Sequence, residues 1–360
     1  MINVTKTYLP SLDEYNKHLK ELWKTSYVTN DGPLVRKLEE KLKKYLGVKN
    51  LSVVSNGTLG LQIAIKVLNL RGEIITTPFS YVATTSSIVW ENCKPVFVDI
   101  NSKTLCIDVN KIEAAITGKT SAILAVHVYG NVCDVEKIDK IAKKYNLKVI
   151  YDAAHAFGVN YKGRSVLNYG DISVLSFHAT KVFHTIEGGA LVTSDGDSAK
   201  RIWFHRNFGH EGSARPDKFL GLGINAKMSE LHAATGLCIL PKMKNMIRKR
   251  KKLTERYDQL LSGCASKMPK TVQGATSNYG YYPVLFESEA QLLKIVKYLN
   301  ANSIFPRRYF YPSLNTLSYV KYNSCPISED ISRKVLCLPL YYELRIEDVG
   351  LIAKLILAKL

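Results

Sequence analysis

Three short segments of the sequence place reactive or ligand-binding residues beside apolar runs. Asn56-Gly57-Thr58, Asp152 and Lys181 each end or follow a strand-like run. A glycine at a strand-to-helix turn lets backbone N–H groups face a phosphate. An aspartate there can bind a metal, a ribose or a protonated ring nitrogen, and it can equally cap the next turn. A lysine whose amine is partly buried can attack a carbonyl carbon, although most lysines only face solvent.

Together, these three segments indicate a particular kind of cofactor site more specifically than any one of them does alone. A phosphate-binding turn, an acid for a pyridinium nitrogen and a lysine for a Schiff base are what a protein supplies to pyridoxal 5'-phosphate. Parallel strands bring residues at their carboxyl ends to the same edge of a sheet, where ligands bind. The sequence therefore predicts a pyridoxal-phosphate enzyme in which Lys181 and Asp152 are the catalytic residues.

The elements that position these residues follow an α/β pattern between about residues 50 and 195. Short apolar runs alternate with helical stretches, and the strands are continuously apolar, which is typical of a mostly parallel sheet covered on both faces. The predicted strands are Leu51–Ser55, Glu73–Thr77, Val96–Asp99, Ala122–His127, Lys148–Asp152, Ile172–Phe177 and Ala190–Thr193, and one clear helix is Val135–Tyr145.

After Pro241 the pattern changes to a long basic helix followed by weaker alternation. Strands are expected around Tyr281–Phe286 and Val335–Leu340, and helices at Gln291–Leu299 and Ile346–Leu360. We expect a large cofactor-binding domain over residues 1–240 and a smaller α+β domain over residues 241–360.

A family resemblance is carried by the motifs NGT, TPFSYVAT, VFVDI, VHVYGN, DAAHAFG, SFHATK with a following EGG, and GINAKMSELHAATG. In this order they resemble the sugar aminotransferases of the DegT/DnrJ/EryC1 family over nearly the whole chain. The resemblance implies an aspartate-aminotransferase-like fold of type I with a seven-stranded sheet. It also implies transfer of an amino group from glutamate to a dTDP-linked 4-keto-6-deoxy sugar for surface polysaccharide.

The resemblance also assigns cofactor contacts, residue by residue. Lys181 matches the Schiff-base lysine, and Asp152 matches the partner of the pyridine nitrogen. The other assigned contacts are Gly57 and Thr58 as backbone donors to the phosphate, Ser176 as a hydroxyl donor, Tyr81 stacked on the ring and His155 beside it.

The remaining assignments concern the partner subunit and the substrate. Asn225 matches a residue that reaches the cofactor phosphate of the neighbouring subunit, which implies a homodimer with shared active sites. Arg307, Tyr309 and Tyr311 fall where relatives contact the nucleotide sugar. Residues 226–228 read Ala-Lys-Met, where many relatives have an aromatic residue and an arginine, and this departure weakens the transfer of substrate contacts.

Charge and composition give weaker clues to function. The formal charge is +19, and the densest basic run is Lys242–Lys252, which at helical spacing is typical of a solvated helix face. A non-catalytic regulator that binds nucleic acid through this face is the alternative from another class, but it predicts loss of Lys181 or Asp152.

Two alternative enzyme activities use the same fold. An aminotransferase that acts on a 3-keto sugar shares every cofactor residue, so this alternative stays open. A deoxygenating relative would carry histidine in place of Lys181.

The cysteines and the hydropathy pattern bear on the cell compartment. The 7 cysteines include no CxxC pair and are interpreted as reduced, and no histidine or cysteine spacing indicates a metal site. No run of residues is apolar for long enough to cross a membrane, and the first residues lack a secretory pattern. We expect a cytoplasmic protein without a membrane or nucleic-acid partner.

Overall fold

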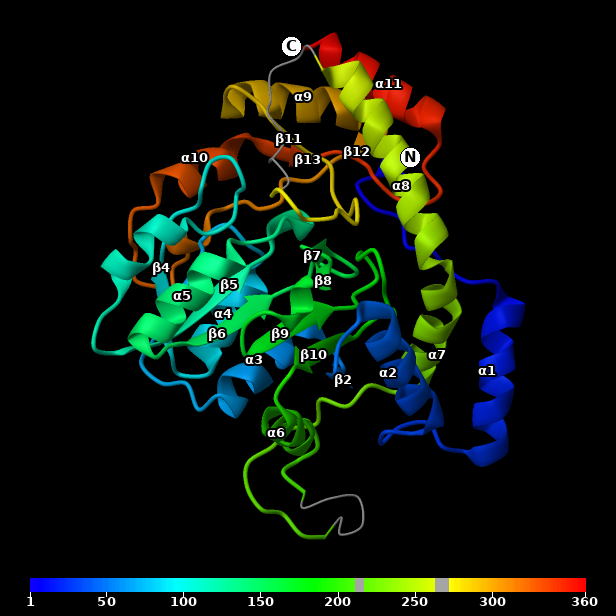
Figure 1. The fold of residues 1–360 in the computed structure, drawn as a ribbon. Coiled ribbons are helices and arrows are strands. Elements are labelled where there is room, and N and C mark those ends of the chain that lie inside the picture. Colours follow the sequence, from blue (N-terminus) through cyan, green and yellow to red (C-terminus); the bar gives the residue numbers. More distant parts are fainter. Residues whose placement is uncertain (211–216, 263–271) are drawn as a thin grey trace.

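The computed structural model describes residues 1–210, 217–262 and 272–360. A twisted central sheet with helices on both faces forms the larger part, and a second layer of helices and short strands lies above it (Figure 1). No helix among the described residues is both long and apolar enough to span a membrane. Six of the cysteines are buried free thiols, while Cys264 lies outside the described ranges.

The central sheet has seven strands, and each overlaps a strand predicted from the sequence. All neighbours run parallel except β10, which is antiparallel to both β2 and β9, so the prediction of a mostly parallel α/β sheet is confirmed. In spatial order the strands are β2 (Asn50–Val54), β10 (Gly189–Thr193), β9 (Ile172–Ser176), β6 (Lys148–Asp152), β5 (Thr120–Val126), β3 (Glu73–Thr76) and β4 (Lys94–Phe97).

Helices cover both faces of the sheet, and those that pack on it bury apolar side chains against it (Figure 1). The predicted helix is α5 (Val135–Tyr145), which buries Val135, Ile138 and Ala142 and leaves its lysines outside. The other helices of this part are α1 (Leu12–Thr25), α2 (Pro33–Leu46), α3 (Gly57–Val67), α4 (Val82–Trp90), α6 (Gly196–Arg206) and α7 (Glu230–Ile239). A two-stranded hairpin, β7 (Asn160–Tyr161) with β8 (Arg164–Ser165), follows β6.

The C-terminal part has an apolar core of its own, which includes Leu253, Tyr257, Ile295, Leu336 and Ile352. Its elements are α8 (Met243–Leu261), β11 (Pro283–Leu285), α9 (Glu289–Ala301), β12 (Ile304–Phe305), α10 (Pro326–Lys334), β13 (Val335–Cys337) and α11 (Ile346–Leu357). β11 pairs with β13, and β12 pairs with β1 (Ile2–Asn3) from the start of the chain. This α+β layer agrees with the sequence pattern, while the boundary at residue 240 stays a prediction.

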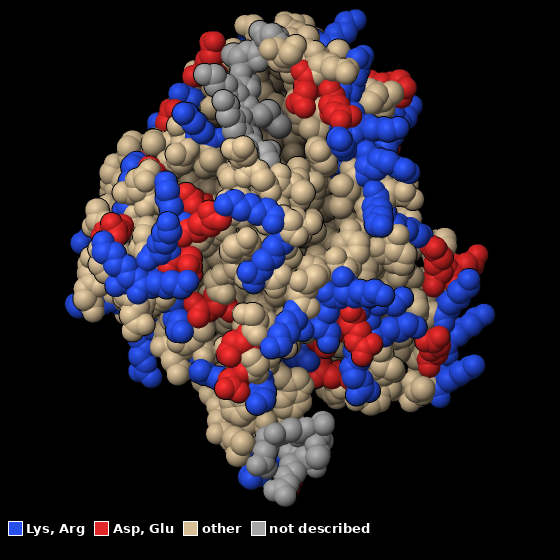
Figure 2. Space-filling model, viewed as in Figure 1, with Lys and Arg blue, Asp and Glu red and all other residues tan. Residues whose placement is uncertain are grey.

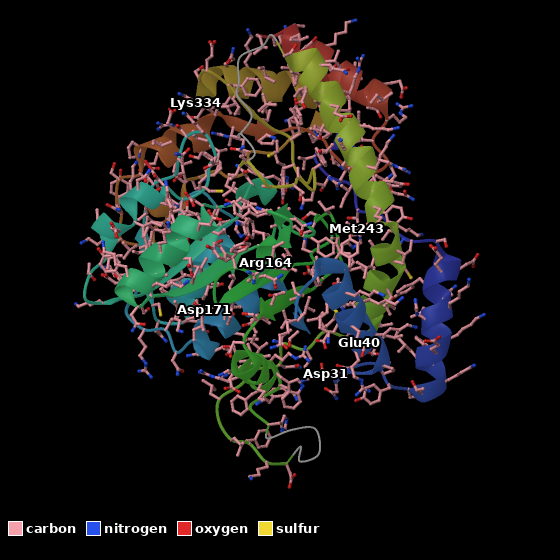
Figure 3. The ribbon with its side chains drawn as sticks, in the orientation of Figure 1. Asp31, Glu40, Arg164, Asp171, Met243 and Lys334 are labelled. Atoms are coloured by element: carbon pink, nitrogen blue, oxygen red, sulfur yellow. The ribbon has the colours of Figure 1, made fainter. Side chains whose placement is uncertain are left out.

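The basic run of the sequence lies on α8, whose first residue is Met243 (Figure 3). One face of α8 is buried through Met246, Arg250 and Leu253. The other side exposes cations of the run, namely Lys244, Arg248, Lys251 and Lys252. Lysine and arginine side chains follow this outer face in Figure 2. Apart from Arg250, the run is therefore largely the exposed face of an amphipathic helix, as its spacing predicts.

Candidate active site

The turn between β2 and α3 forms a cradle for an anion. The Asn56 side chain caps α3, since its Oδ1 accepts a hydrogen bond from the Leu59 N–H at 2.9 Å. Gly57 is the first residue of the helix, and a Cβ there would lie 3.1 Å from the Ser176 Cβ. The first N–H groups of a helix have no partner within it, and its dipole favours negative charge at this end. Gly57, Thr58 and the adjacent Ser176 are thus arranged to bind a phosphate.

Asp152 is a buried carboxylate at the carboxyl end of β6. Its Oδ2 accepts a hydrogen bond from the Thr84 Oγ1 at 2.7 Å, and its Oδ1 accepts one from the Ala154 N–H at 3.1 Å. Burial raises the pKa of Asp152, while these two donors and the Lys181 charge oppose the rise. The side chain is fixed in one orientation and has a charged neighbour in Lys181.

His155 follows Asp152 closely and stays neutral. Burial, together with the charge of Lys181, lowers the pKa of His155 well below its usual range. The Tyr129 N–H donates to Nδ1 at 3.2 Å, so the ring proton is on Nε2. This Nε2 is buried without a hydrogen-bond partner among the described residues, and it is available to a bound molecule.

Lys181 lies in the same pocket, after the carboxyl end of β9. Burial lowers the pKa of its ammonium group, and the Asp152 carboxylate opposes the change. Its Nζ donates to the Tyr281 hydroxyl at 3.2 Å. A buried amine with a lowered pKa is the form that attacks a carbonyl carbon and exchanges protons.

One pocket of about 760 Å³ brings most of the predicted residues together. Tyr81 precedes α4 at its mouth and is 59% exposed, which leaves its ring free to face a ligand. Arg307 and Tyr309, from the C-terminal part of the chain, line the same pocket. The predicted residues that line it are Gly57, Thr58, Tyr81, Asp152, His155, Ser176, Lys181, Arg307 and Tyr309.

Two predicted residues lie outside this pocket. Asn225 is exposed and forms a backbone bridge with Asn207, so its side chain does not reach the pocket of its own chain. Tyr311 is 50% exposed, and the Arg308 guanidinium stacks on its ring with 3.7 Å between the guanidinium carbon and the ring centroid. Within one chain, the structure therefore does not place Tyr311 with Arg307 and Tyr309.

Comparisons with known proteins agree with this geometry. The DegT/DnrJ/EryC1/StrS aminotransferase family model matches residues 11–356. The chain belongs to this family. A dTDP-4-amino-4,6-dideoxy-D-glucose transaminase from Shigella dysenteriae is 44% identical over 352 residues, which cover 95% of each protein.

Two solved structures share the fold. The crystal structure of DesI with its TDP-sugar product is 31% identical, has a TM-score of 0.93, and matches 99% of this chain and 93% of that one. NtdA from Bacillus subtilis with bound cofactor PMP is 28% identical, has a TM-score of 0.88, and matches 97% of this chain and 81% of that one. The predicted fold class is confirmed.

DegT/DnrJ/EryC1/StrS aminotransferases depend on pyridoxal phosphate, and the residues of this chain fit that group. The unpaired Nε2 of His155 offers a hydrogen-bond donor beside Asp152, and the cradle at Gly57 leaves room for a phosphate that a Cβ would restrict. When bound, the cofactor withdraws electrons from the substrate carbon so that a proton can leave it.

Several residues in or beside the pocket were not assigned a role from the sequence. Thr84 lies in the TPFSYVAT segment, but only the folded chain places its hydroxyl at the Asp152 carboxylate. Phe310 stacks on the His155 ring with 5.4 Å between centroids. Tyr281 was predicted only as part of a strand, and it contacts Lys181 from 100 residues away. Sequence spacing cannot reveal contacts that the tertiary fold creates.

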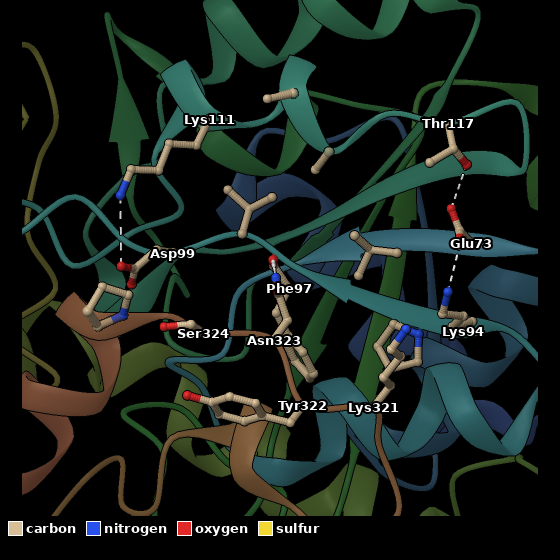
Figure 4. A pocket seen from close by; sticks show the side chains of 16 residues that line it. Glu73, Lys94, Phe97, Asp99, Lys111, Thr117, Lys321, Tyr322, Asn323 and Ser324 are labelled. Carbon is tan, nitrogen blue, oxygen red and sulfur yellow. Dashed lines mark hydrogen bonds and ion pairs between the residues drawn. The ribbon is translucent and has the colours of Figure 1, made fainter.

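A second pocket lies at the β4 edge of the sheet and is distinct from the first (Figure 4). Its carboxylates already have partners: Glu73 pairs with Lys94 at 2.9 Å and accepts from the Thr117 hydroxyl at 2.6 Å. Asp99 accepts from the backbone N–H groups of Ile327 and Ser328 at the start of α10. Asp99 thus holds α10 of the C-terminal part against the sheet edge.

Proposed function

We propose that this protein transfers an amino group from L-glutamate to carbon 4 of dTDP-4-keto-6-deoxyglucose, which gives the 4-amino-4,6-dideoxy sugar. The observation that carries this proposal is the full-length identity of 44% to a dTDP-4-amino-4,6-dideoxy-D-glucose transaminase. Asp152 and Lys181 in one pocket support it, because ionisable groups whose pKa values are shifted by burial and by each other's charge are typical of functional sites.

In this proposal Asp152 stays ionised and holds a proton on the ring nitrogen of the cofactor. Lys181 anchors the cofactor and, as a free amine, takes a proton from one carbon and returns it to the next. Gly57, Thr58 and Ser176 bind the phosphate. Tyr81 and His155 would hold the cofactor ring, Tyr81 through its exposed aromatic ring and His155 through the buried Nε2 donor.

Arg307 and Tyr309 are proposed to contact the nucleotide sugar. The guanidinium of Arg307 lines the pocket and suits the phosphates of the substrate. Tyr311 lies outside the pocket of its own chain, so its proposed substrate contact lies at the pocket's outer rim or at the second subunit of a dimer.

We further propose a cytoplasmic homodimer with shared active sites, with residues 1–240 as the cofactor domain and residues 241–360 as the smaller domain. Exposed apolar side chains flank Asn225, which suits burial against a second copy; they are Phe208, Phe219, Leu220, Leu222 and Ile224. Mixed dimers of Lys181→Ala and Asn225→Ala protomers test this. Each variant alone is expected to be weak, and mixing should restore turnover at one site per mixed dimer. No recovery on mixing contradicts shared sites.

The decisive experiment for the reaction is an incubation of the enzyme with pyridoxal phosphate, L-glutamate and dTDP-4-keto-6-deoxyglucose, followed by NMR of the product. An amine at carbon 4 is the expected result, and the product is proposed to feed surface polysaccharide. If no product forms but glutamate still bleaches the colour of the bound cofactor, the proposed substrate is wrong. The next substrates to test are then 3-keto sugars and UDP- or GDP-linked sugars.

A further inference from the structure

Tyr281 makes a contact with Lys181 that no motif of the sequence predicts. The Lys181 Nζ donates to the Tyr281 hydroxyl at 3.2 Å, and this is its one side-chain hydrogen bond within the described ranges. The Tyr281 ring is packed edge-on to His155 at 4.9 Å and to Tyr309 at 5.9 Å between centroids. Tyr281 therefore contacts the Lys181 amine and the rings of His155 and Tyr309, which all line the pocket.

The segment that carries Tyr281 is tied to both parts of the molecule. On the large-domain side, the Asn278 Nδ2 donates to the carbonyl oxygens of His155 at 2.8 Å and Phe157 at 3.1 Å. On the other side, the Arg250 guanidinium from α8 donates to the carbonyl oxygen of Gly280 at 3.4 Å. Both anchors are buried, so the hydroxyl has little freedom to move.

We propose that Tyr281 is a positioning residue of the active site, which holds the Lys181 amine by a hydrogen bond and aims it at the reacting carbon. This rests on the proposed role of Lys181. A lysine has four rotatable side-chain bonds, and an amine that must reach two carbons in turn needs a fixed reference point. A hydroxyl anchored from two sides supplies one.

The chemistry of the pair suits this task. Burial raises the pKa of the Tyr281 phenol, so the hydroxyl stays neutral and does not form an ion pair that would trap the ammonium. A neutral hydroxyl accepts from the ammonium and can remain beside the free amine. It thereby orients Lys181 in both protonation states without neutralising it.

The test compares Tyr281→Phe with Tyr282→Phe. The matched control removes a neighbouring hydroxyl that donates to Asp258 at 2.9 Å and lies outside the pocket. Cofactor-free protein is labelled with formaldehyde and cyanoborohydride over a range of pH, and methylation of Lys181 is quantified by mass spectrometry. Loss of an acceptor for the ammonium should lower the pH midpoint of Lys181 labelling by about one unit in Tyr281→Phe. Tyr282→Phe should match the unmodified protein.

A second readout is turnover of the loaded enzyme. Tyr281→Phe is expected to lower kcat by about tenfold with KM nearly unchanged, because the amine is less well aimed. An unchanged labelling midpoint in Tyr281→Phe overturns this inference and leaves the role of Lys181 intact. Full turnover by Lys181→Ala would instead overturn the proposed function itself.

A further variant covers the case in which Tyr281→Phe does not fold. A Cβ at Gly280 would lie 3.1 Å from the Asn278 Oδ1 and 3.2 Å from the Val182 Cγ2. Gly280→Ala therefore keeps the hydroxyl but displaces it slightly. A smaller shift of the labelling midpoint in the same direction supports the proposal, and a midpoint equal to that of the unmodified protein contradicts it.

Discussion

The pocket has two walls of different construction. The first wall is formed by strand ends of the central sheet, where Asp152 is buried, Lys181 is partly buried, and Asp152 is held by hydrogen bonds to Thr84 and Ala154. The second wall is the segment 307–310, which is attached to β13 through two backbone hydrogen bonds between Arg307 and Cys337. Arg307 itself is exposed.

This difference separates two demands on the site. Groups that exchange protons need fixed positions and altered pKa values, which a buried sheet edge provides. Residues that recognise a particular sugar can change in type when they lie on a segment outside the central sheet, such as 307–310, without disturbing the sheet. We therefore expect substitutions in the first wall to affect kcat and those in the second wall to affect KM.

The largest expected effect is that of Lys181→Ala. Turnover should fall by about 10⁴-fold, because the variant loses both the covalent anchor and the group that moves the proton. The absorption band of the lysine-bound cofactor should also disappear. Turnover is measured in the glutamate-dependent assay, and the absorption band is measured from the spectrum of the purified protein.

Lys200→Ala is the matched control, since Lys200 is an exposed lysine that pairs with Asp197 at the surface. It should retain normal turnover. Clear activity in the Lys181→Ala protein would mean that another residue moves the proton, and the first wall would lose its assigned role.

Arg307→Met tests the second wall of the pocket, the segment 307–310. KM for the nucleotide sugar should rise about 10- to 100-fold while kcat changes little, because a charge-assisted contact to phosphate is lost. Steady-state kinetics at saturating glutamate measure this. Arg308→Met is the control, because Arg308 pairs with Glu289 at 2.6 Å and lies outside the pocket.

The Arg308→Met protein is expected to keep its KM and to lose some thermal stability. Equal KM values for both variants would show that the nucleotide sugar does not contact Arg307. The second wall would then require a different set of substrate residues.

The same contrast explains what could be predicted from sequence. The strands and the helix α5 were predictable because apolar periodicity is local, and Asp152 and Lys181 because they occupy strand ends in recognisable motifs. The antiparallel direction of β10 and the contact of Tyr281 with Lys181 depend on distant pairing, which a linear pattern does not encode. Tyr311 was grouped with Arg307 by the family resemblance, but its ring lies against the Arg308 guanidinium instead.

The smallest expected effect concerns stability, and it again distinguishes the walls. Burial raises the pKa of Asp152 above the value of about 3.9 for an aspartate in an unfolded chain. At pH values between the pKa of Asp152 in the unfolded chain and its higher pKa in the folded protein, the folded protein binds more protons than the unfolded chain. The free energy of unfolding therefore falls as pH rises through this window. At neutral pH the buried, ionised carboxylate therefore makes the cofactor-free protein less stable.

Asp152→Asn removes this charge and should lose most activity while raising the melting temperature of the cofactor-free protein by about 2 °C at pH 7. The gain should vanish as the pH falls below about 4, where the carboxylate of the unmodified protein is protonated. Thermal melts at several pH values measure both. Arg307→Met should show no such gain because Arg307 is exposed and carries no burial cost. A gain independent of pH would instead indicate better packing of the amide, and the charge argument for the first wall would fail.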